Sequence, residues 1–496
     1  MLFNSLTFIF IFLPVTLAGF FAIGSRGHHR IAIAWLVGAS LFFYGWWNPA
    51  YLALILGSIL FNYAIGVALG GYQQAVSGRR LLAFGIAGNL GLLGYFKYAN
   101  FFVDNIDLLT GADFHLAKIV LPLAISFFTF QQIAYLVDAW KGDTREYNFL
   151  HYCLFVTFFP QLIAGPIVHH KEMLPQFAKD WIYRLNYENL AVGVTIFTVG
   201  LFKKVVLADG VAEYATPVFN AAEAGVVLEF HEAWLGALAY TFQLYFDFSG
   251  YSDMAIGLAR LFGIRLPLNF NSPYKANNII EFWRYWHMTL SRFLRDYLYI
   301  PLGGNRKGKS RRYINLMITM LLGGLWHGAG WTFIMWGALH GFYLVVNHAW
   351  HALRRWLNIA VGESTIAGRG VARLITFTAV VISWVFFRAE SLDGAVHILS
   401  AMFGGNGFSL SASWPDGPRM LVPLLLLAWY APNTQQIMAR YAPAFETYRG
   451  EVKACRFTWL QWRPTLLFAI IAAVLFMVSV KTIITVPDSA FLYFNF

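Results

Sequence analysis

Runs of about 20 apolar residues recur along the whole chain, and this feature constrains the fold more than any other. A helix of about 20 residues is long enough to cross a hydrocarbon core of about 30 Å. Of the 496 residues, 58% are apolar and only 12% are charged, whereas the charged fraction of an average soluble domain is roughly twice as high. We therefore predict an all-α polytopic membrane protein with about eleven transmembrane helices, plus re-entrant or interfacial helices, in one integral-membrane domain over residues 1–496.

The predicted spans follow the apolar runs. They cover residues 2–24, the segment before Trp46-Trp47, 50–71, 81–102, 117–139, 188–208, 231–263, 313–347, 371–388, 420–432 and 464–486. Basic loops at 25–30 and 78–80 are expected on the cytoplasmic side, and a loop with Asp104, Asp107 and Asp113 on the outer side. Residues 149–177 contain Pro160, Gly165 and Pro166, so we expect an interrupted or re-entrant element there.

The net charge of the chain is +11. On a soluble protein this value could indicate nucleic-acid binding, but here the basic residues lie mainly in short loops, which favours positive-inside topology and no nucleic-acid partner. No Lys or Arg precedes Arg26, so we interpret residues 2–24 as a retained first span rather than a signal peptide. Cys153 and Cys455 are far apart, show neither zinc nor disulfide spacing, and are expected to serve packing.

A polar, aromatic and basic block begins at Asn271, and residues 270–345 form the predicted catalytic core. Asn278 and Glu281 match a capping box, which predicts a helix from about residue 279. On that helix Trp283, His287, Ser291 and Arg295 would share one face, because they recur every four residues. So many polar positions favour an in-plane interfacial helix, or one facing a wet cavity, over a spanning helix.

Five basic residues follow Gly303-Gly304-Asn305 within seven positions: Arg306, Lys307, Lys309, Arg311 and Arg312. Two interpretations of this run stay open. It can anchor the topology on the cytoplasmic face, or it can bind an anionic donor or a lipid head group.

His327 lies in the most unusual segment of the chain, Gly323-Gly324-Leu325-Trp326-His327-Gly328-Ala329-Gly330-Trp331. An ionisable group at membrane depth is a hypothesis of a functional site. The glycines allow a ligand to approach the backbone closely, and Trp326 and Trp331 can wall a slot, although a buried histidine is also commonly a packed side chain. His340 lies outside that glycine setting and is a weaker candidate.

Other polar residues within apolar sequence can have either a structural or a functional role. Asp247 and Asp253 do not share a helical face, so a structural role such as pairing with Arg260 or a backbone donor is favoured over lining the active cavity. His169 and His170 are expected to be interfacial histidines.

No nucleophile elbow, His-Glu-x-x-His pattern, phosphate-binding loop or dinucleotide fingerprint occurs in the sequence. The sequence does not exclude a metal site built from His287, His327 and His340. Their spacing matches no standard pattern, and we predict no metal site. A histidine takes and returns a proton near neutral pH. The predicted chemistry is therefore proton transfer at an acceptor hydroxyl, with the acyl group arriving on an activated thioester.

Four segments carry a resemblance to a known family: FPQLIAGPIVHH (159–170), FDFSGYSDMAIGLARLFGIRLPLNFNSPY (246–274), EFWRYWHMTLSRFLRDYLYIPLGGNR (281–306) and LLGGLWHGAGWTFIMWGALHG (321–341). They resemble the membrane-bound O-acyltransferase family, and most of all its bacterial alginate O-acetyltransferase type. The likeness runs over nearly the whole chain. His169 stands where the family pattern leads us to expect Arg.

The resemblance implies a ring of tilted helices around a thin core, with funnels from both faces meeting at a catalytic histidine. The catalytic histidine of the family falls on His327, and its second characteristic histidine on His287. We place a substrate or donor channel around them, lined by Trp283, Ser291, Arg295, Asp296, Trp326, Trp331 and His340.

The same resemblance implies the setting of the reaction. The chain would be a multi-pass protein of the bacterial inner membrane, in contact with membrane lipid and with no bound cofactor. It would take acetyl groups from a cytoplasmic donor, acetyl-CoA. A periplasmic SGNH-type partner would place them on an exported polysaccharide such as alginate. The alternatives are teichoic-acid D-alanylation, peptidoglycan or cellulose acetylation, or a non-catalytic transporter that uses Asp247 and Asp253.

Overall fold

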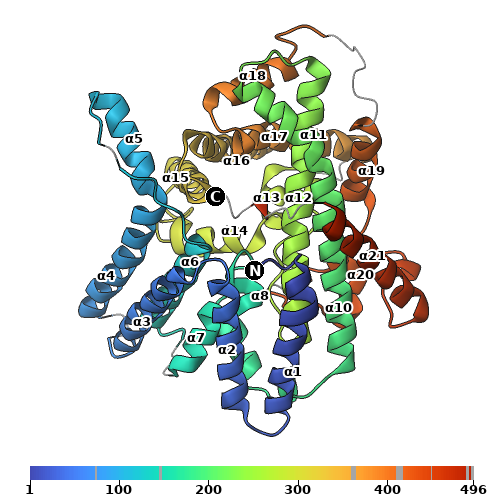
Figure 1. Ribbon diagram of the computed structural model, residues 1–496. Helices are drawn as coiled ribbons and strands as arrows, with labels where there is room; N and C mark the ends of the chain where they lie inside the picture. The colour runs from blue at the N-terminus through green and yellow to red at the C-terminus, as the bar shows by residue number, and fades with distance from the viewer. Residues whose placement is uncertain are drawn as a thin grey trace. The chain divides into compact units, whose positions relative to one another are not determined.

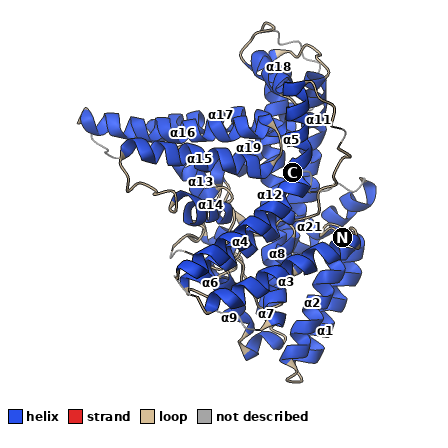
Figure 2. Ribbon diagram, turned by 90° about the vertical axis from the view of Figure 1, so that its left-hand side faces the viewer, coloured by secondary structure: helices blue, strands red, loops and turns tan. Residues whose placement is uncertain are grey.

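The computed structural model of the chain describes residues 1–72, 75–114, 116–144, 148–358, 365–408, 417–447, 450–486 and 491–492. Regular structure in these residues is helical (Figure 1, Figure 2). They contain no named strand, only one isolated bridge between Pro267 and Phe445. The all-α prediction is confirmed.

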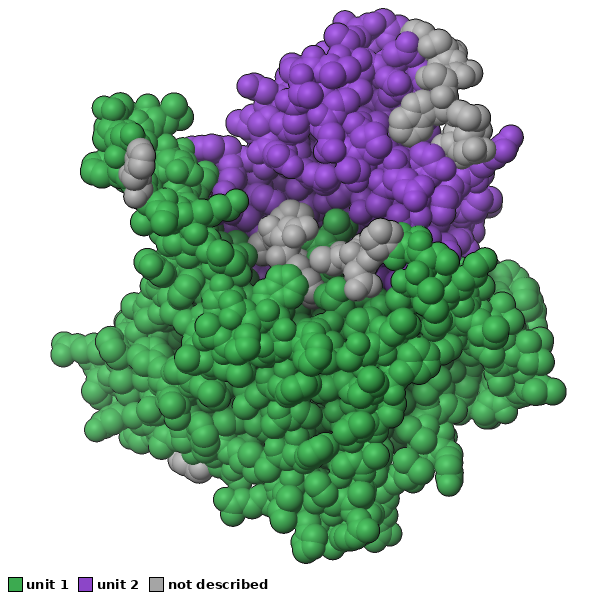
Figure 3. All heavy atoms as spheres, in the orientation of Figure 1, with its two compact units in different colours: residues 1–202, 251–268, 438–495 green, residues 203–250, 269–437, 496 purple. Residues whose placement is uncertain are grey.

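The chain divides into two compact units, each assembled from segments that are distant in sequence (Figure 3). Unit 1 comprises residues 1–202, 251–268 and 438–495, and unit 2 comprises residues 203–250, 269–437 and 496. The predicted catalytic core, residues 270–345, lies entirely within unit 2. The single domain over residues 1–496 stays a prediction.

Most helices belong to one unit only. In unit 1 they are α1 (Leu13–Gly24), α2 (His29–Gly45), α3 (Ala50–Gly70), α4 (Val76–Leu93), α5 (Ala99–Thr110), α6 (Ile125–Lys141), α7 (Phe149–Thr157), α8 (Phe159–Leu162), α9 (His170–Phe177), α10 (Tyr187–Phe202) and α21 (Leu466–Thr485). In unit 2 they are α11 (Asp209–Glu223), α13 (Ile279–Tyr285), α14 (Met288–Leu294), α15 (Lys309–His327), α16 (Trp331–Trp356), α17 (Ile366–Arg388), α18 (Leu392–Met402) and α19 (Gly417–Tyr430). Helices α12 (Phe230–Leu261) and α20 (Thr434–Met438) contribute residues to both.

Four helices in the described part of the chain are long and apolar enough to cross a membrane: Ala50–Gly70, Tyr187–Glu223, Ile366–Arg388 and Leu466–Thr485. Shorter apolar helices cover Phe8–Gly24, Leu392–Met402 and Arg419–Tyr430. These features agree with a membrane protein, while the total of eleven spans stays a prediction. Trp46 and Trp47, which mark the predicted end of the second span, lie in the loop before α3 and are more than half exposed.

Three of the predicted boundaries that the structure contradicts have a local physical reason. The span predicted over residues 188–208 does not end there, because Lys203–Ala208 is a π-helical turn inside one helix from Tyr187 to Glu223. Asp104 and Asp107 belong to α5 rather than to a loop, because a second π-helical turn (Gly94–Tyr98) carries the helix on from α4. Helix α6 begins at Ile125 rather than near 117, since Pro122 disfavours helical backbone before it.

The interruption predicted within residues 149–177 is confirmed. Helix α7 ends at Thr157, the four-residue helix α8 follows, and α9 begins only at His170. Gly165 packs against the backbone of Pro160 and Gln161, at distances that leave no room for a Cβ atom.

Helices α15 and α16 form the hairpin that carries His327. The two helices run side by side (Figure 2). A Cβ atom on Gly324 would overlap the Phe333 carbonyl oxygen, and one on Gly337 would overlap the Met320 carbonyl oxygen. Glycine therefore allows the two backbones to approach more closely than any other residue would.

Candidate active site

His327 is the last residue of α15, and it lies buried in a cage of aromatic rings. Only 3% of its surface is exposed. The imidazole centroid lies 4.9 Å from the Trp326 ring, 4.9 Å from the Trp336 ring and 5.1 Å from the Phe387 ring. Helices α15, α16 and α17 thus each supply part of the wall.

The glycines beside His327 serve packing rather than an open slot. A Cβ atom on Gly328 would overlap the Phe333 ring, and Gly324 lies against the backbone of α16. At Gly330, by contrast, the nearest neighbour of an added Cβ atom would be 3.6 Å away. The interpretation that this glycine set opens a path for a ligand is therefore wrong for Gly324 and Gly328.

The helix predicted through His287 is broken at that residue. Helix α13 begins after Asn278, whose side chain accepts a hydrogen bond from the Glu281 amide at 2.9 Å, as predicted. It ends at Tyr285, and His287 adopts the left-handed conformation with φ +42° at the start of α14. Trp283, His287, Ser291 and Arg295 consequently do not share one helical face, because the break rotates the second helix relative to the first.

The backbone turn directs His287 into the interior, where it is fully buried. Its ring centroid lies 6.5 Å from that of His327 and 4.8 Å from that of Phe248. A non-glycine residue in the left-handed region carries strain of about 1–3 kcal/mol, and such residues cluster at active sites. The two histidines singled out from the sequence are therefore neighbours in unit 2.

Asn269 fixes the tautomer of His287. Asn269 Oδ1 accepts hydrogen bonds from the Thr289 amide at 3.4 Å and the Thr289 hydroxyl at 2.9 Å. That atom must be the amide oxygen, so His287 Nδ1, 3.0 Å away, is the nitrogen that donates to it. In the neutral ring Nε2 then carries the lone pair. Sequence reasoning missed Asn269 because 18 positions separate it from His287.

His340 lies on α16, one helical turn after Trp336, and is fully buried. Its Nε2 atom is 2.9 Å from the Ser383 hydroxyl on α17. The His340 ring contacts Trp336 at 4.8 Å and Trp283 at 5.1 Å between centroids. Trp336, Phe387 and Ser383 were not singled out from the sequence. Trp336 lies within the segment 321–341 that resembles the family, and no motif marks the other two.

Trp331 differs from the tryptophans of the cage in its exposure. It is 55% exposed at the start of α16, whereas Trp326 and Trp336 are buried. Trp336 takes the place that the sequence interpretation gave to Trp331, since it contacts the His327 ring directly.

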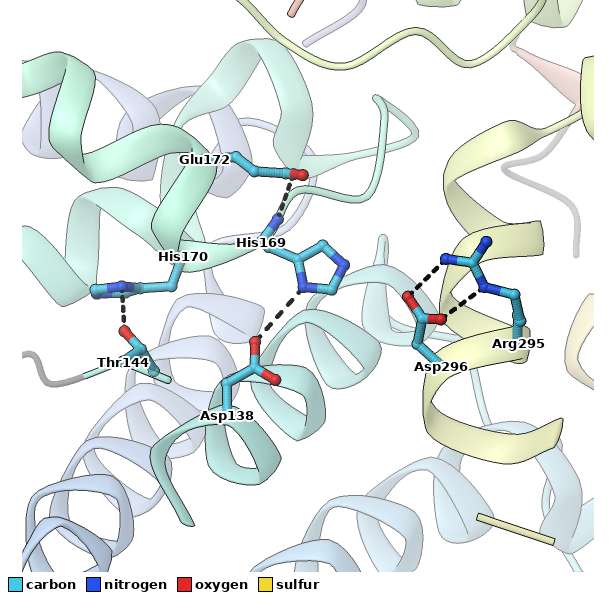
Figure 4. A network of polar contacts seen from close by, with 7 residues as sticks. All are labelled: Asp138, Thr144, His169, His170, Glu172, Arg295 and Asp296. Carbon is cyan, nitrogen blue, oxygen red and sulfur yellow. Dashed lines mark hydrogen bonds and ion pairs between the residues drawn. The ribbon is translucent and has the colours of Figure 1, made fainter. Parts of the chain in front are cut away.

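The remaining predicted channel residues lie on α14 and the π-helical turn that follows it (Arg295–Tyr299). The Ser291 hydroxyl donates to the Trp286 carbonyl oxygen at 3.4 Å. Arg295 Nε and Nη2 donate to the two carboxylate oxygens of Asp296 at 2.7 and 3.1 Å (Figure 4). This pair is part-exposed, so its net contribution to stability is small.

Asp247 pairs with a partner that the sequence did not indicate. Lys204 Nζ lies 2.8 Å from Asp247 Oδ1 and 2.7 Å from Asp209 Oδ1, and the Lys204 and Asp247 side chains are almost completely buried. The predicted partner, Arg260, instead lies 3.7 Å from Glu188 within unit 1. Asp253 is also buried. The buried ion pair with Lys204, which lies in the π-helical turn, agrees with a structural role for Asp247.

His169 and His170 are buried in unit 1 rather than interfacial. His169 Nδ1 lies 3.5 Å from Asp138 Oδ2, and its backbone amide donates to Glu172 at 3.1 Å (Figure 4). His170 Nδ1 lies 2.6 Å from the Thr144 hydroxyl. These contacts hold the chain where α9 begins.

The basic run lies at the start of the α15–α16 hairpin. Lys309 begins α15, and the Arg312 guanidinium donates to the His348 ring on α16 at 2.7 Å. Among the described residues, no group of three or more His, Cys, Asp or Glu side chains is arranged to hold a metal ion.

Comparison with known proteins decides the family. The sequence profile of the membrane-bound O-acyltransferase family matches residues 141–387, which include His287, His327 and His340. The chain is 49% identical over 436 residues to a peptidoglycan O-acetyltransferase of Helicobacter pylori, covering 83% of this chain and 81% of that protein. The chain belongs to the membrane-bound O-acyltransferase family.

Two further relatives show the range of the likeness. A probable alginate O-acetylase AlgI of Pseudomonas putida is 40% identical over 508 residues, covering 100% of both chains. A teichoic acid D-alanyltransferase of Streptococcus thermophilus is 30% identical over 284 residues, covering 53% of this chain and 68% of that protein. The protein is therefore an O-acyltransferase and a membrane protein, and the non-catalytic transporter alternative is not supported.

Proposed function

We propose that this O-acyltransferase moves acetyl groups from cytoplasmic acetyl-CoA across the bacterial inner membrane for O-acetylation of an exported polysaccharide such as alginate. The observation that carries the proposal is the juxtaposition of His327 and His287 in the aromatic cage of unit 2, within a chain whose relatives include alginate O-acetylases along its full length.

His327 acts as the general base or acyl relay, and His287 orients the donor or the acceptor. A neutral imidazole buried among aromatic rings accepts the proton of the acceptor hydroxyl as its oxygen attacks the thioester carbon. The C–S bond breaks, and the CoA thiolate takes up that proton and leaves. A positioned base of this kind is worth about 10²–10⁴-fold in rate. The hydrogen bond from His287 Nδ1 to Asn269 fixes the orientation of the His287 ring, whose centroid lies 6.5 Å from that of His327. A periplasmic SGNH-type protein then places the acetyl group on the polymer.

Peptidoglycan is the second candidate acceptor, because the relative at 49% identity is a peptidoglycan O-acetyltransferase. Transfer of D-alanine to teichoic acid has weaker support, since that relative matches only about half of this chain.

The test is base-labile acetate in cells that lack the chromosomal gene and express His327→Ala or wild type at equal membrane levels. Acetate is measured separately on the exported polysaccharide and on muropeptides. We expect His327→Ala to abolish the acetate in one of the two fractions, and that fraction identifies the acceptor. Wild-type acetate in both fractions of the variant refutes the role of His327.

A further inference from the structure

Three rings of unit 2 contact one another beside His327. Trp336 and His340 lie one turn apart on α16, and Trp283 reaches them from α13. The Trp283 centroid is 5.8 Å from Trp336 and 5.1 Å from His340, and the Trp336 and His340 centroids are 4.8 Å apart. Because Trp336 also lies 4.9 Å from His327, this three-ring cluster adjoins the candidate active site.

Ser383 determines which nitrogen of His340 carries the proton. The Ser383 hydroxyl has a single hydrogen, and it lies 2.8 Å from the Val380 carbonyl oxygen, which can only accept. His340 Nε2, 2.9 Å from the same hydroxyl, must therefore donate to it. In the neutral ring Nδ1 is left as a hydrogen-bond acceptor.

The cluster holds two donors and one acceptor that have no partner among the described residues. They are the indole N–H groups of Trp283 and Trp336 and the Nδ1 atom of His340, all three buried. A buried polar group without a hydrogen bond costs about 1–3 kcal/mol, so three on touching rings call for an explanation.

One hydroxyl group matches this set. By number and kind, it brings one hydrogen for His340 Nδ1 and two lone pairs for the two indole N–H groups. A carbonyl, carboxylate or phosphate oxygen brings no hydrogen for Nδ1, and an ammonium group brings no lone pair for the indoles.

We propose that Trp283, Trp336 and His340 bind a hydroxyl group of the acyl acceptor and hold it beside His327, with Ser383 as the positioning residue that fixes the His340 tautomer. This inference rests on the proposed function. No bond is made or broken in the cluster, so its contribution is binding and orientation.

Two amide substitutions of His340 separate this role from a structural one. The amide of His340→Asn overlays Nδ1 and can still accept from the hydroxyl, whereas that of His340→Gln overlays Nε2 and can still donate to Ser383. We expect the asparagine variant to form acetate esters about fivefold faster than the glutamine variant. The purified glutamine variant should have the higher melting temperature. If acetate formation follows the same order as melting temperature, the hydroxyl site is refuted.

The indole donor is tested by Trp336→Phe, which removes the N–H and keeps an aromatic ring. We expect about a fivefold loss of acetate esters at matched membrane level. Ser383→Ala should also lower the rate of acetate formation, whereas Ser383→Thr, which keeps the hydroxyl, should keep the wild-type rate. Variants that change only the melting temperature would show that the cluster holds a structural water, and would overturn the proposal. His327→Ala in the same assay tests the proposed function separately.

Discussion

The rings of His287 and His327 lie 6.5 Å apart between centroids, although helix α14, a π-helical turn, a basic loop and helix α15 separate them in the chain. The contact depends on a left-handed residue. Helix α13 has ended at Tyr285, and His287, with φ +42°, starts α14 in a new direction with its ring buried. In a continuous helix over the same residues, the His287 ring would point in another direction and would not lie beside His327.

Replacement of Asn269 is expected to disturb this arrangement. Asn269→Ala leaves His287 Nδ1–H and the Thr289 hydroxyl without their acceptor, which costs about 1–3 kcal/mol. It also releases the His287 ring, so acetate formation should fall at least tenfold at matched membrane level. Thr289→Val is the control, because it removes one donor and keeps the His287 bond. Equal activity of both variants contradicts the role of Asn269.

The backbone strain at His287 can be measured with two variants that both lack the imidazole. His287→Gly relieves the left-handed conformation and His287→Ala does not. We expect the glycine variant to be more stable by about 1 kcal/mol in thermal unfolding of the purified protein. A more stable alanine variant would contradict a left-handed backbone at this position.

Close packing of α15 on α16 makes two glycines intolerant of a methyl group. Gly324→Ala and Gly337→Ala place a Cβ atom against a carbonyl oxygen of the other helix, and we expect each to cost about 2 kcal/mol or more. The readout is melting temperature together with membrane level. Gly330→Ala is the matched control, since its Cβ would meet nothing closer than 3.6 Å, and it should behave as wild type.

The buried lysine of the π-helical turn should depend on its carboxylate partners. Lys204→Met leaves the Asp247 carboxylate buried beside Asp209 without its cation. Breaking such a pair costs about 3–5 kcal/mol. The double variant Lys204→Met/Asp247→Asn should recover part of that loss in melting temperature. A double variant as unstable as the sum of the two single variants would show that the ion pair is not coupled.

The sequence by itself determined the features that depend on nearby residues. Apolar runs determined an all-helical membrane protein, Asn278 determined the start of α13, and Pro160 with Gly165 determined the interruption before α9. The motif around His327 indicated the family. Each of these signals acts over a few residues, through backbone hydrogen bonds, steric limits or contact with lipid.

Only the tertiary structure decided how the site is assembled. The bond of His287 to Asn269, the cage formed by Trp336 and Phe387, and the pairing of Asp247 with Lys204 all join segments distant in the chain. Local hydropathy and helical spacing carry no information about such contacts. They arise when the helices and the segments between them pack together, because packing determines which rings touch and which buried polar atoms find partners.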